Sequence, residues 1–216
     1  MTTEDAARHV AKVMQPISGL LYQQASRALV LADNRVGDLA RQGDKGLLSR
    51  TMRGDLRALL VGQELQGWCV AGKPARGGEL YLQHPETGFL LRFLKERRQT
   101  YPGGVPVAGY NNARRNWWSQ PPCQAPLPGM EDSTDREIKL LLLWDLVDSD
   151  DLERGILMRV VHPLAPGRYG SSVPVDLSVE LTELGGLWGG LEFVGDDDLT
   201  DFFPDEETGT GLQEAR

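Results

Sequence analysis

The chain has 216 residues, of which 40 % are hydrophobic, so it can bury a substantial core and disorder throughout is excluded. No apolar run reaches eighteen residues, and the acidic N-terminus lacks the basic-then-apolar layout of a signal peptide. We therefore expect a cytoplasmic protein with no membrane span. Cys69 and Cys123 lie far apart with no further Cys or His at metal-ligand spacing, so we expect no disulfide framework and no structural zinc site. We also expect no other metal site and no cofactor.

The formal net charge of -8 is unevenly distributed along the chain. Residues 1–130 hold 17 Lys and Arg against 10 Asp and Glu, a balance of +7. Residues 131–216 hold 6 against 21, a balance of -15. The basic part predicts an anionic partner, and the acidic part predicts either a solvated segment or a basic protein partner. Charges also fall unevenly in proteins that have no such partners.

Residues 4–65 have the apolar spacing of helices. Apolar residues recur every three or four positions after Pro16, which a first helical position tolerates, so we expect a helix that ends near Asn34. The short segment VGDLARQ follows, and GDKG then interrupts the pattern. A second helix has an apolar face formed by Leu48, Met52, Leu56, Leu59 and Leu60. Gly54 weakens this helix by about 1 kcal/mol relative to alanine.

Six later segments have the composition and alternation of β-strands. They are GWCVAG (67–72), GELYLQH (78–84), GFLLRFLKER (88–97), EIKLLLLWDL (137–146), GILMRVVHPL (155–164) and SVPVDLSVEL (172–181). The turns HPETG and DSDD favour antiparallel neighbours within each set of three. Residues 140–144 show no polar alternation, which predicts a central strand buried on both faces.

These patterns predict an α+β fold with a helical region (1–65), a β-meander (66–98), a Pro/Gly-rich connection (99–133), a second antiparallel strand set (134–183) and an acidic tail (184–216). The connection contains six prolines and four glycines. The tail is poor in packing residues, so we expect it to be flexible. The sequence leaves open whether the strand sets form one sheet or two, and which oligomeric state the chain adopts.

The order of elements over residues 16–84 resembles a winged helix-turn-helix DNA-binding domain. In this comparison VGDLARQ is the first helix of the motif, LLSRTMRGDLRALL is the groove-reading helix, and WCVAGKPARGGELYL is the wing. The resemblance implies base-edge contacts from the second helix and phosphate contacts from the wing. The residues at these positions are Arg50, Arg53, Arg57, Lys73 and Arg76. A helical subdomain packed on a sheet, with a hairpin that merely turns at KPARGG, fits the same pattern.

The stretch YNNARRNWWSQ (110–120) places two arginines beside two tryptophans. Such a combination is typical of single-stranded nucleic-acid sites, where the rings stack on bases while Arg114 and Arg115 hold phosphates. A short helix that anchors itself through its tryptophans is the alternative. Tryptophan is rarely left fully exposed, so we expect a structural role for Trp118 and leave the two arginines as candidate partner contacts.

Glu137-Ile138-Lys139 is similar to the acid-x-lysine element of metal-dependent nucleases that resemble restriction enzymes. There the carboxylate holds magnesium, and the lysine stabilises developing charge. A tripeptide of this kind occurs about once by chance in a chain of this length. The pattern also requires an acidic residue on a neighbouring strand, for which Glu79 is the only convenient candidate.

The remaining catalytic templates are missing from the sequence. None of the three histidines stands beside a Ser or Cys in a nucleophile setting, and there is no phosphate-binding glycine motif. We therefore expect a non-enzymatic regulatory or interaction protein whose basic N-terminal part binds nucleic acid. The alternative is a protein-binding inhibitor or antitoxin-like partner that uses the acidic C-terminal part. A metal-dependent nuclease acting through Glu137 and Lys139 is a third hypothesis.

Overall fold

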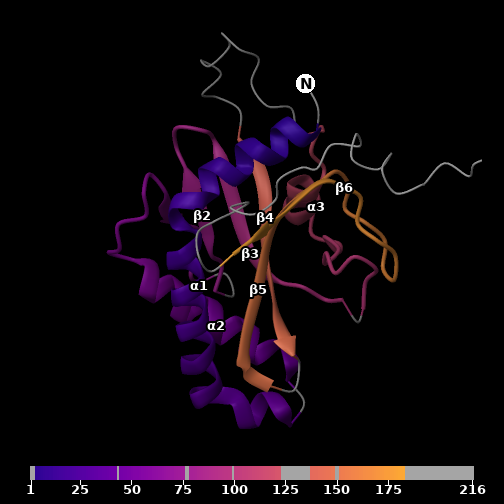
Figure 1. Cartoon of the computed structure of the whole chain (residues 1–216). Helices are drawn as coiled ribbons and strands as arrows, with labels where there is room; N and C mark the ends of the chain where they lie inside the picture. The colour runs from indigo at the N-terminus through magenta and orange to yellow at the C-terminus, as the bar shows by residue number, and fades with distance from the viewer. Residues whose placement is uncertain are drawn as a thin grey trace, which may run out of the picture.

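The computed structural model describes residues 3–42, 44–75, 78–98, 100–122, 137–148 and 151–182. It confirms the α+β fold: N-terminal helices α1 (Thr3–Arg41) and α2 (Lys45–Leu60) precede a six-stranded sheet. Figure 1 shows these helices on one side of the sheet and the short helix α3 (Asn112–Trp118) on the other. The expected tail (184–216), Arg76 and Cys123 lie outside the described residues.

The six predicted strands form one mixed sheet in chain order. They are β1 (Cys69–Ala71), β2 (Tyr81–His84), β3 (Phe89–Lys95), β4 (Ile138–Asp148), β5 (Asp151–Pro163) and β6 (Val175–Leu181). The antiparallel pairing predicted within each set of three is confirmed. The two sets meet at β3 and β4, which pair in parallel, and the sequence did not predict this join. Parallel neighbours need a long crossover connection, and the segment 96–137 supplies it.

Helix α1 is longer than the sequence predicted. The expected end near Asn34 is wrong, because α1 continues to Arg41 and VGDLARQ forms its last turns instead of a separate helix. Arg41 binds two carboxylates of the same helix, Asp33 at 3.2 Å and Asp38 at 3.0 Å. An ion pair between Arg35 and Asp55 also joins this part of α1 to α2. These contacts stabilise the last turns against the helix-weakening Gly37.

Pro16 lies inside α1 and not at its first position, which corrects the expected N-terminal boundary. A proline within a helix removes one backbone hydrogen bond and costs about 3 kcal/mol or more. The residues around it are among the most deeply buried of the chain: Val10, Met14, Ile17 and Leu21. Each such side chain contributes about 1.5–3 kcal/mol when buried, so packing offsets the cost of the proline.

Two hydrophobic cores cover the two faces of the sheet. One core packs α1 and α2 against alternate strand residues, and it includes Met52, Leu56 and Leu60 from the predicted face of α2. The other packs Trp117 and Trp118 of the crossover segment against the opposite face. The prediction for residues 140–144 is confirmed, because all five side chains are fully buried.

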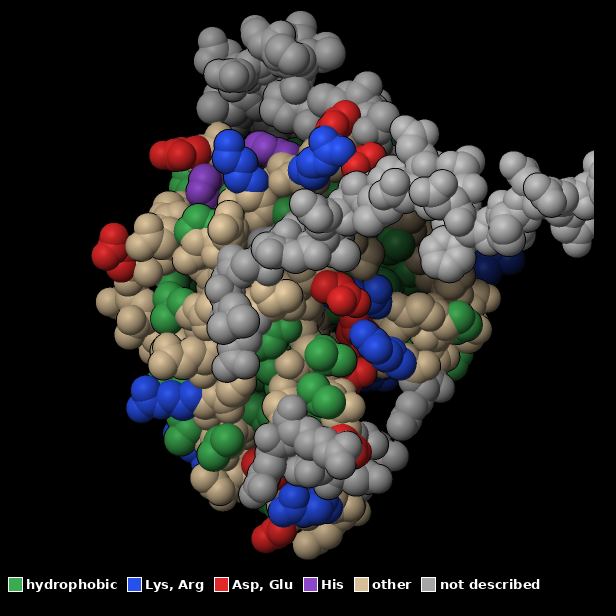
Figure 2. Space-filling view, viewed as in Figure 1, with side chains coloured by type: hydrophobic (Ala, Val, Ile, Leu, Met, Phe, Trp, Pro, Cys, Tyr) green, Lys and Arg blue, Asp and Glu red, His purple; other side chains and the backbone are tan. Residues whose placement is uncertain are grey.

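Charged side chains of both signs are scattered over the face of the molecule that Figure 2 shows. On the face seen in Figure 2, Lys and Arg lie close to Asp and Glu, and no single sign covers that face. Among the described residues, no helix is both long enough and apolar enough to cross a membrane.

Candidate functional site

A cleft of about 560 Å³ lies at the C-terminal end of β3. Strand β2 pairs with β3 only as far as Arg92, which lies opposite Tyr81. Beyond Arg92, the edge of β3 that faces β2 borders the cleft, while the other edge remains paired with β4. The opposite wall comes from the first turns of α2, which contribute Gly46 and Ser49. We call this site the basic cleft, because its lining includes Arg50, Arg53, Arg92, Lys95, Arg97, Arg98 and Arg114.

Helix α2 carries Arg50 and Arg53 on one side, since residues three apart are neighbours on a helix surface. Asp44 caps this helix by accepting a hydrogen bond from the Gly46 N–H at 3.1 Å, and its other carboxylate oxygen pairs with Arg50 at 2.7 Å. The β1–β2 hairpin packs on the same turn: a Cβ at Gly78 would lie 3.3 Å from the Arg50 carbonyl oxygen. The wall that presents these two arginines is therefore fixed at both ends.

Arg92 of β3 lies over aromatic rings on the face that carries α3. Its guanidinium carbon is 5.6 Å from the centroid of the Tyr81 ring and 5.8 Å from those of Trp117 and Trp118. Among the described residues, no hydrogen bond or ion pair engages this side chain. Cation–π contacts hold the group in place while leaving its N–H donors available to a ligand.

Arg114 reaches the basic cleft from α3. Asn111 caps this helix by accepting from the Arg114 backbone N–H at 3.2 Å, which favours helix formation at this position. The Arg114 guanidinium lies 5.4 Å from the centroid of the Trp118 ring and donates to the Val107 carbonyl oxygen at 3.5 Å. Its Nε is buried and has no hydrogen-bond partner within the described part of the chain.

Both tryptophans of YNNARRNWWSQ belong to the core. The predicted structural role of Trp118 is confirmed: it is fully buried, and its indole N–H donates to the Pro106 carbonyl oxygen at 2.9 Å. Trp117 is 8 % exposed and stacks on Tyr81 with ring centroids 4.8 Å apart. Neither ring is available to stack on a base. Arg115 is exposed and does not line the basic cleft.

The positively charged side chains of the basic cleft repel one another. Burial lowers the pKa of Arg53, and the charges of Arg92, Arg114 and Arg50 lower it further. The pKa of Arg114 is likewise lowered, first by burial and then by Arg92 and Arg97. Crowded, partly buried cations of this kind are more often found at functional sites than elsewhere. A bound anion would relieve their repulsion.

Lys95 forms the end of the cleft on the other face of β3. Burial lowers its pKa, and Asp145 partly opposes that effect by raising it. Its ammonium nitrogen lies 5.2 Å from the centroid of the Trp144 ring. Lys95 therefore adds positive charge at the sheet edge, although Asp145 compensates part of that charge.

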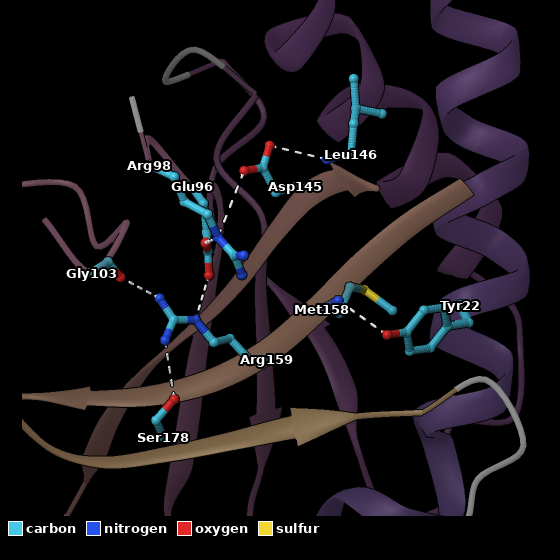
Figure 3. Close-up of polar contacts among 9 residues, drawn as sticks. All are labelled: Tyr22, Glu96, Arg98, Gly103, Asp145, Leu146, Met158, Arg159 and Ser178. Atoms are coloured by element: carbon cyan, nitrogen blue, oxygen red, sulfur yellow. Dashed lines mark hydrogen bonds and ion pairs between the residues drawn. The ribbon is translucent and has the colours of Figure 1, made fainter. Parts of the chain in front are cut away.

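The cleft also contains two acidic residues, Glu96 and Asp145. Their carboxylates are engaged by Arg98, Arg159 and the Leu146 backbone N–H (Figure 3). Glu96 is 3 % exposed and accepts from the Arg98 Nε at 2.6 Å and from the Arg159 guanidinium. Asp145 accepts from the Leu146 backbone N–H at 3.0 Å and lies 4.0 Å from Arg98. These carboxylates thus neutralise Arg98 and Arg159.

The same network fixes the loop after β3. Arg159 of β5 donates to the Gly103 carbonyl oxygen at 2.5 Å and to the Ser178 hydroxyl at 3.2 Å (Figure 3). Gly104 has φ +76°, and a Cβ there would lie 2.6 Å from a Glu96 carboxylate oxygen. A side chain at this φ would be strained and would have to displace the Glu96 carboxylate. The Gly104 carbonyl oxygen accepts from the Arg97 backbone N–H at 2.8 Å, which holds the loop that carries Arg97 and Arg98.

Three of the seven predicted nucleic-acid-binding residues, Arg50, Arg53 and Arg114, meet in the basic cleft. Arg57 instead donates to the Ala71 carbonyl oxygen at 2.6 Å and ties α2 to β1. Lys73 is exposed in the hairpin, outside the cleft. The sequence analysis missed the cleft residues from β3 and its following loop: Arg92, Lys95, Arg97 and Arg98. Their signal was the basic run RFLKERR at the end of a predicted strand.

The residues of the nuclease hypothesis lie elsewhere. Glu137 and Lys139 form an ion pair at 3.8 Å at the start of β4, whereas the cleft is at the end of that strand. The Glu79 carboxylate accepts from the Tyr81 hydroxyl and from the Lys73 backbone N–H. Within the described ranges, no group of three His, Cys, Asp or Glu residues is placed to hold a metal ion.

Comparison with known proteins gives no family for this chain: no protein-family model, curated protein or solved structure matches it. The winged helix-turn-helix resemblance stays a prediction. Its groove-reading helix corresponds to α2 and its wing to the β1–β2 hairpin, while its first helix lies within α1. Function is therefore inferred from the geometry and charge of the basic cleft.

Proposed function

We propose that the chain binds nucleic acid and that the basic cleft holds phosphate groups of a single strand. The observation that carries this proposal is the convergence of guanidinium groups from three segments far apart in the sequence. Arg53 comes from α2, Arg92 from β3 and Arg114 from α3. Each guanidinium presents a planar fork of N–H donors that matches phosphate oxygens.

The size of the cleft favours a single strand over a duplex. Its volume of about 560 Å³ is within the roughly 300–1,000 Å³ typical of sites that enclose one small molecule. A nucleotide-sized part of a strand fits such a space, whereas a duplex would have to remain outside it. The exposed Lys73 is then available for a further contact along the strand.

Binding of this kind depends on phosphates more than on bases. Trp117 and Trp118 next to the arginines are buried, and the partly buried Tyr81 stacks on Trp117, so these rings orient cations and do not stack on bases. Phosphate contacts give little sequence preference and a strong dependence on salt. We therefore expect the chain to bind strands of different sequence with similar affinity.

The test is fluorescence anisotropy with a labelled single-stranded oligonucleotide at several salt concentrations. We expect the logarithm of the affinity to fall linearly with the logarithm of the salt concentration. Arg53→Gln should reduce this slope by the amount expected for the loss of about one phosphate contact. Arg27→Gln is the matched control, because Arg27 is an exposed arginine of α1 outside the cleft. No binding at low salt, or equal losses in both variants, would overturn the proposal.

A further inference from the structure

We infer that the part of the basic cleft formed by Arg53, Arg92 and Arg114 is a subsite for the terminal phosphomonoester of a nucleic-acid strand. This inference rests on the proposed function and refines it. A strand would enter the cleft by its phosphorylated end, while its internal phosphodiesters contact the surrounding surface.

The first step concerns charge. A phosphomonoester carries about -1.5 to -2 charges at neutral pH and three acceptor oxygens, whereas an internal phosphodiester carries one charge and two free oxygens. Arg92 and Arg114 lie over the same Trp118 ring, at 5.8 Å and 5.4 Å from its centroid. The pKa of Arg53 is lowered first by burial and then by the charges of Arg92 and Arg114, and the pKa of Arg114 is lowered first by burial and then by Arg92. A dianion compensates such a cluster better than a monoanion does.

The second step concerns the carboxylates of the cleft. Glu96 is engaged by Arg98 and Arg159, and Asp145 lies beside Arg98 and Lys95. Their negative charge is placed at the end of β3 and not at Arg92, which has no carboxylate partner among the described residues. Arg92 therefore keeps a positive charge that no ion pair among the described residues removes, and Arg114 lies beside it over the Trp118 ring.

The third step concerns orientation. Arg92 lies over Tyr81, Trp117 and Trp118, and Arg114 lies over Trp118, so one aromatic group supports both guanidinium groups. The buried Arg114 Nε has no hydrogen-bond partner within the described ranges. Donors that are oriented before binding lose little freedom when they bind, which favours recognition of one compact anion.

The experiment compares three labelled single strands of one sequence, with a 5′-phosphate, a 3′-phosphate or hydroxyl groups at both ends. We expect one phosphorylated end to raise affinity at least about tenfold near neutral pH, because it adds charge-assisted hydrogen bonds. The phosphorylated strand that binds more tightly shows which end of a strand enters the cleft. The preference should shrink below about pH 6, where the monoester takes up its second proton.

Variants separate this inference from the proposed function. Arg92→Gln should remove the preference for the phosphorylated end, Arg92→Lys should retain only part of it, and Arg27→Gln should retain all of it. Arg114→Gln tests the same subsite from α3 if Arg92→Gln does not fold. Equal binding of all three strands would overturn the subsite and leave the proposed function standing. Failure of every strand to bind would overturn the subsite and the proposed function together. A preference for the phosphorylated end that survives both Arg92→Gln and Arg114→Gln would show that these arginines do not form the subsite.

Discussion

The indole N–H of Trp118 donates to the carbonyl oxygen of Pro106 at 2.9 Å and thereby joins α3 to the wall of the basic cleft. Trp118 is fully buried in the core on the α3 side of the sheet, and Arg92 and Arg114 lie over its ring. One side chain therefore packs the crossover segment on the sheet and supports two of the proposed phosphate ligands.

Replacing Trp118 should damage the fold as well as the cleft. We expect Trp118→Ala to lower the free energy of unfolding by about 3–5 kcal/mol, because it leaves a cavity in the core. Trp118→Phe should cost less, since it keeps most of the packing and loses mainly the hydrogen bond to Pro106. Urea unfolding measures both values. A near-zero effect of Trp118→Ala would mean that the ring is not part of the core.

Arg114 and Arg115 are adjacent on α3 but should behave differently. Arg115 is exposed and outside the cleft, so Arg115→Ala should change the free energy of unfolding by less than about 0.5 kcal/mol and have little effect on binding. Arg114→Ala should reduce the slope of log affinity against log salt concentration by the amount expected for the loss of about one phosphate contact. Equal binding losses in the two variants would place the ligand outside the cleft.

Glu96 should contribute strongly to stability. Its buried carboxylate pairs with Arg159, whose side chain is 18 % exposed, so Glu96→Gln leaves an uncompensated cation beneath the loop. Breaking a buried pair in this way costs about 3–5 kcal/mol. Thermal and urea unfolding measure the loss, and Glu86→Gln in the exposed β2–β3 turn is the control. Matching stabilities of the two variants would contradict the role assigned to Glu96.

Stability should fall as the solution becomes mildly acidic. The pKa of His9 is lowered by burial and by the charges of Lys12 and His84, so the folded chain binds this proton less readily than the unfolded chain does. The unfolded state therefore gains protons first as pH falls through about 6.5, and the free energy of unfolding decreases. Urea unfolding at several pH values should show a shallower decrease for His9→Gln. An unchanged slope would exclude His9 as a cause.

The sequence predicted the strands well because each has a local pattern. Residues 140–144 lack polar alternation, and the structure buries all of them in the sheet centre. The end of α1 was predicted wrongly because its last turns depend on partners, including Asp55 of α2, that no local pattern reveals. The parallel pairing of β3 with β4 was missed for a related reason, since an apolar run does not specify its neighbour or direction.

The candidate site was predicted only in part. Arg50 and Arg53 were found because they stand on one face of a predicted helix, and Arg114 because it belongs to an unusual local motif. Arg92 was missed because its strand register, and not its neighbours in the sequence, brings it to the aromatic rings. Three of the expected residues, Arg57, Lys73 and Arg115, are conspicuous in the sequence but lie outside the cleft.

The parallel contact between β3 and β4 also bears on how the chain folds. These strands can meet only after the segment between Lys95 and Ile138 has closed a loop, and such long-range closure slows folding. The β4–β5 hairpin needs no such closure, because Asp148 pairs with Asp151. During refolding, recovery of oligonucleotide binding should therefore lag behind the early recovery of helical circular dichroism.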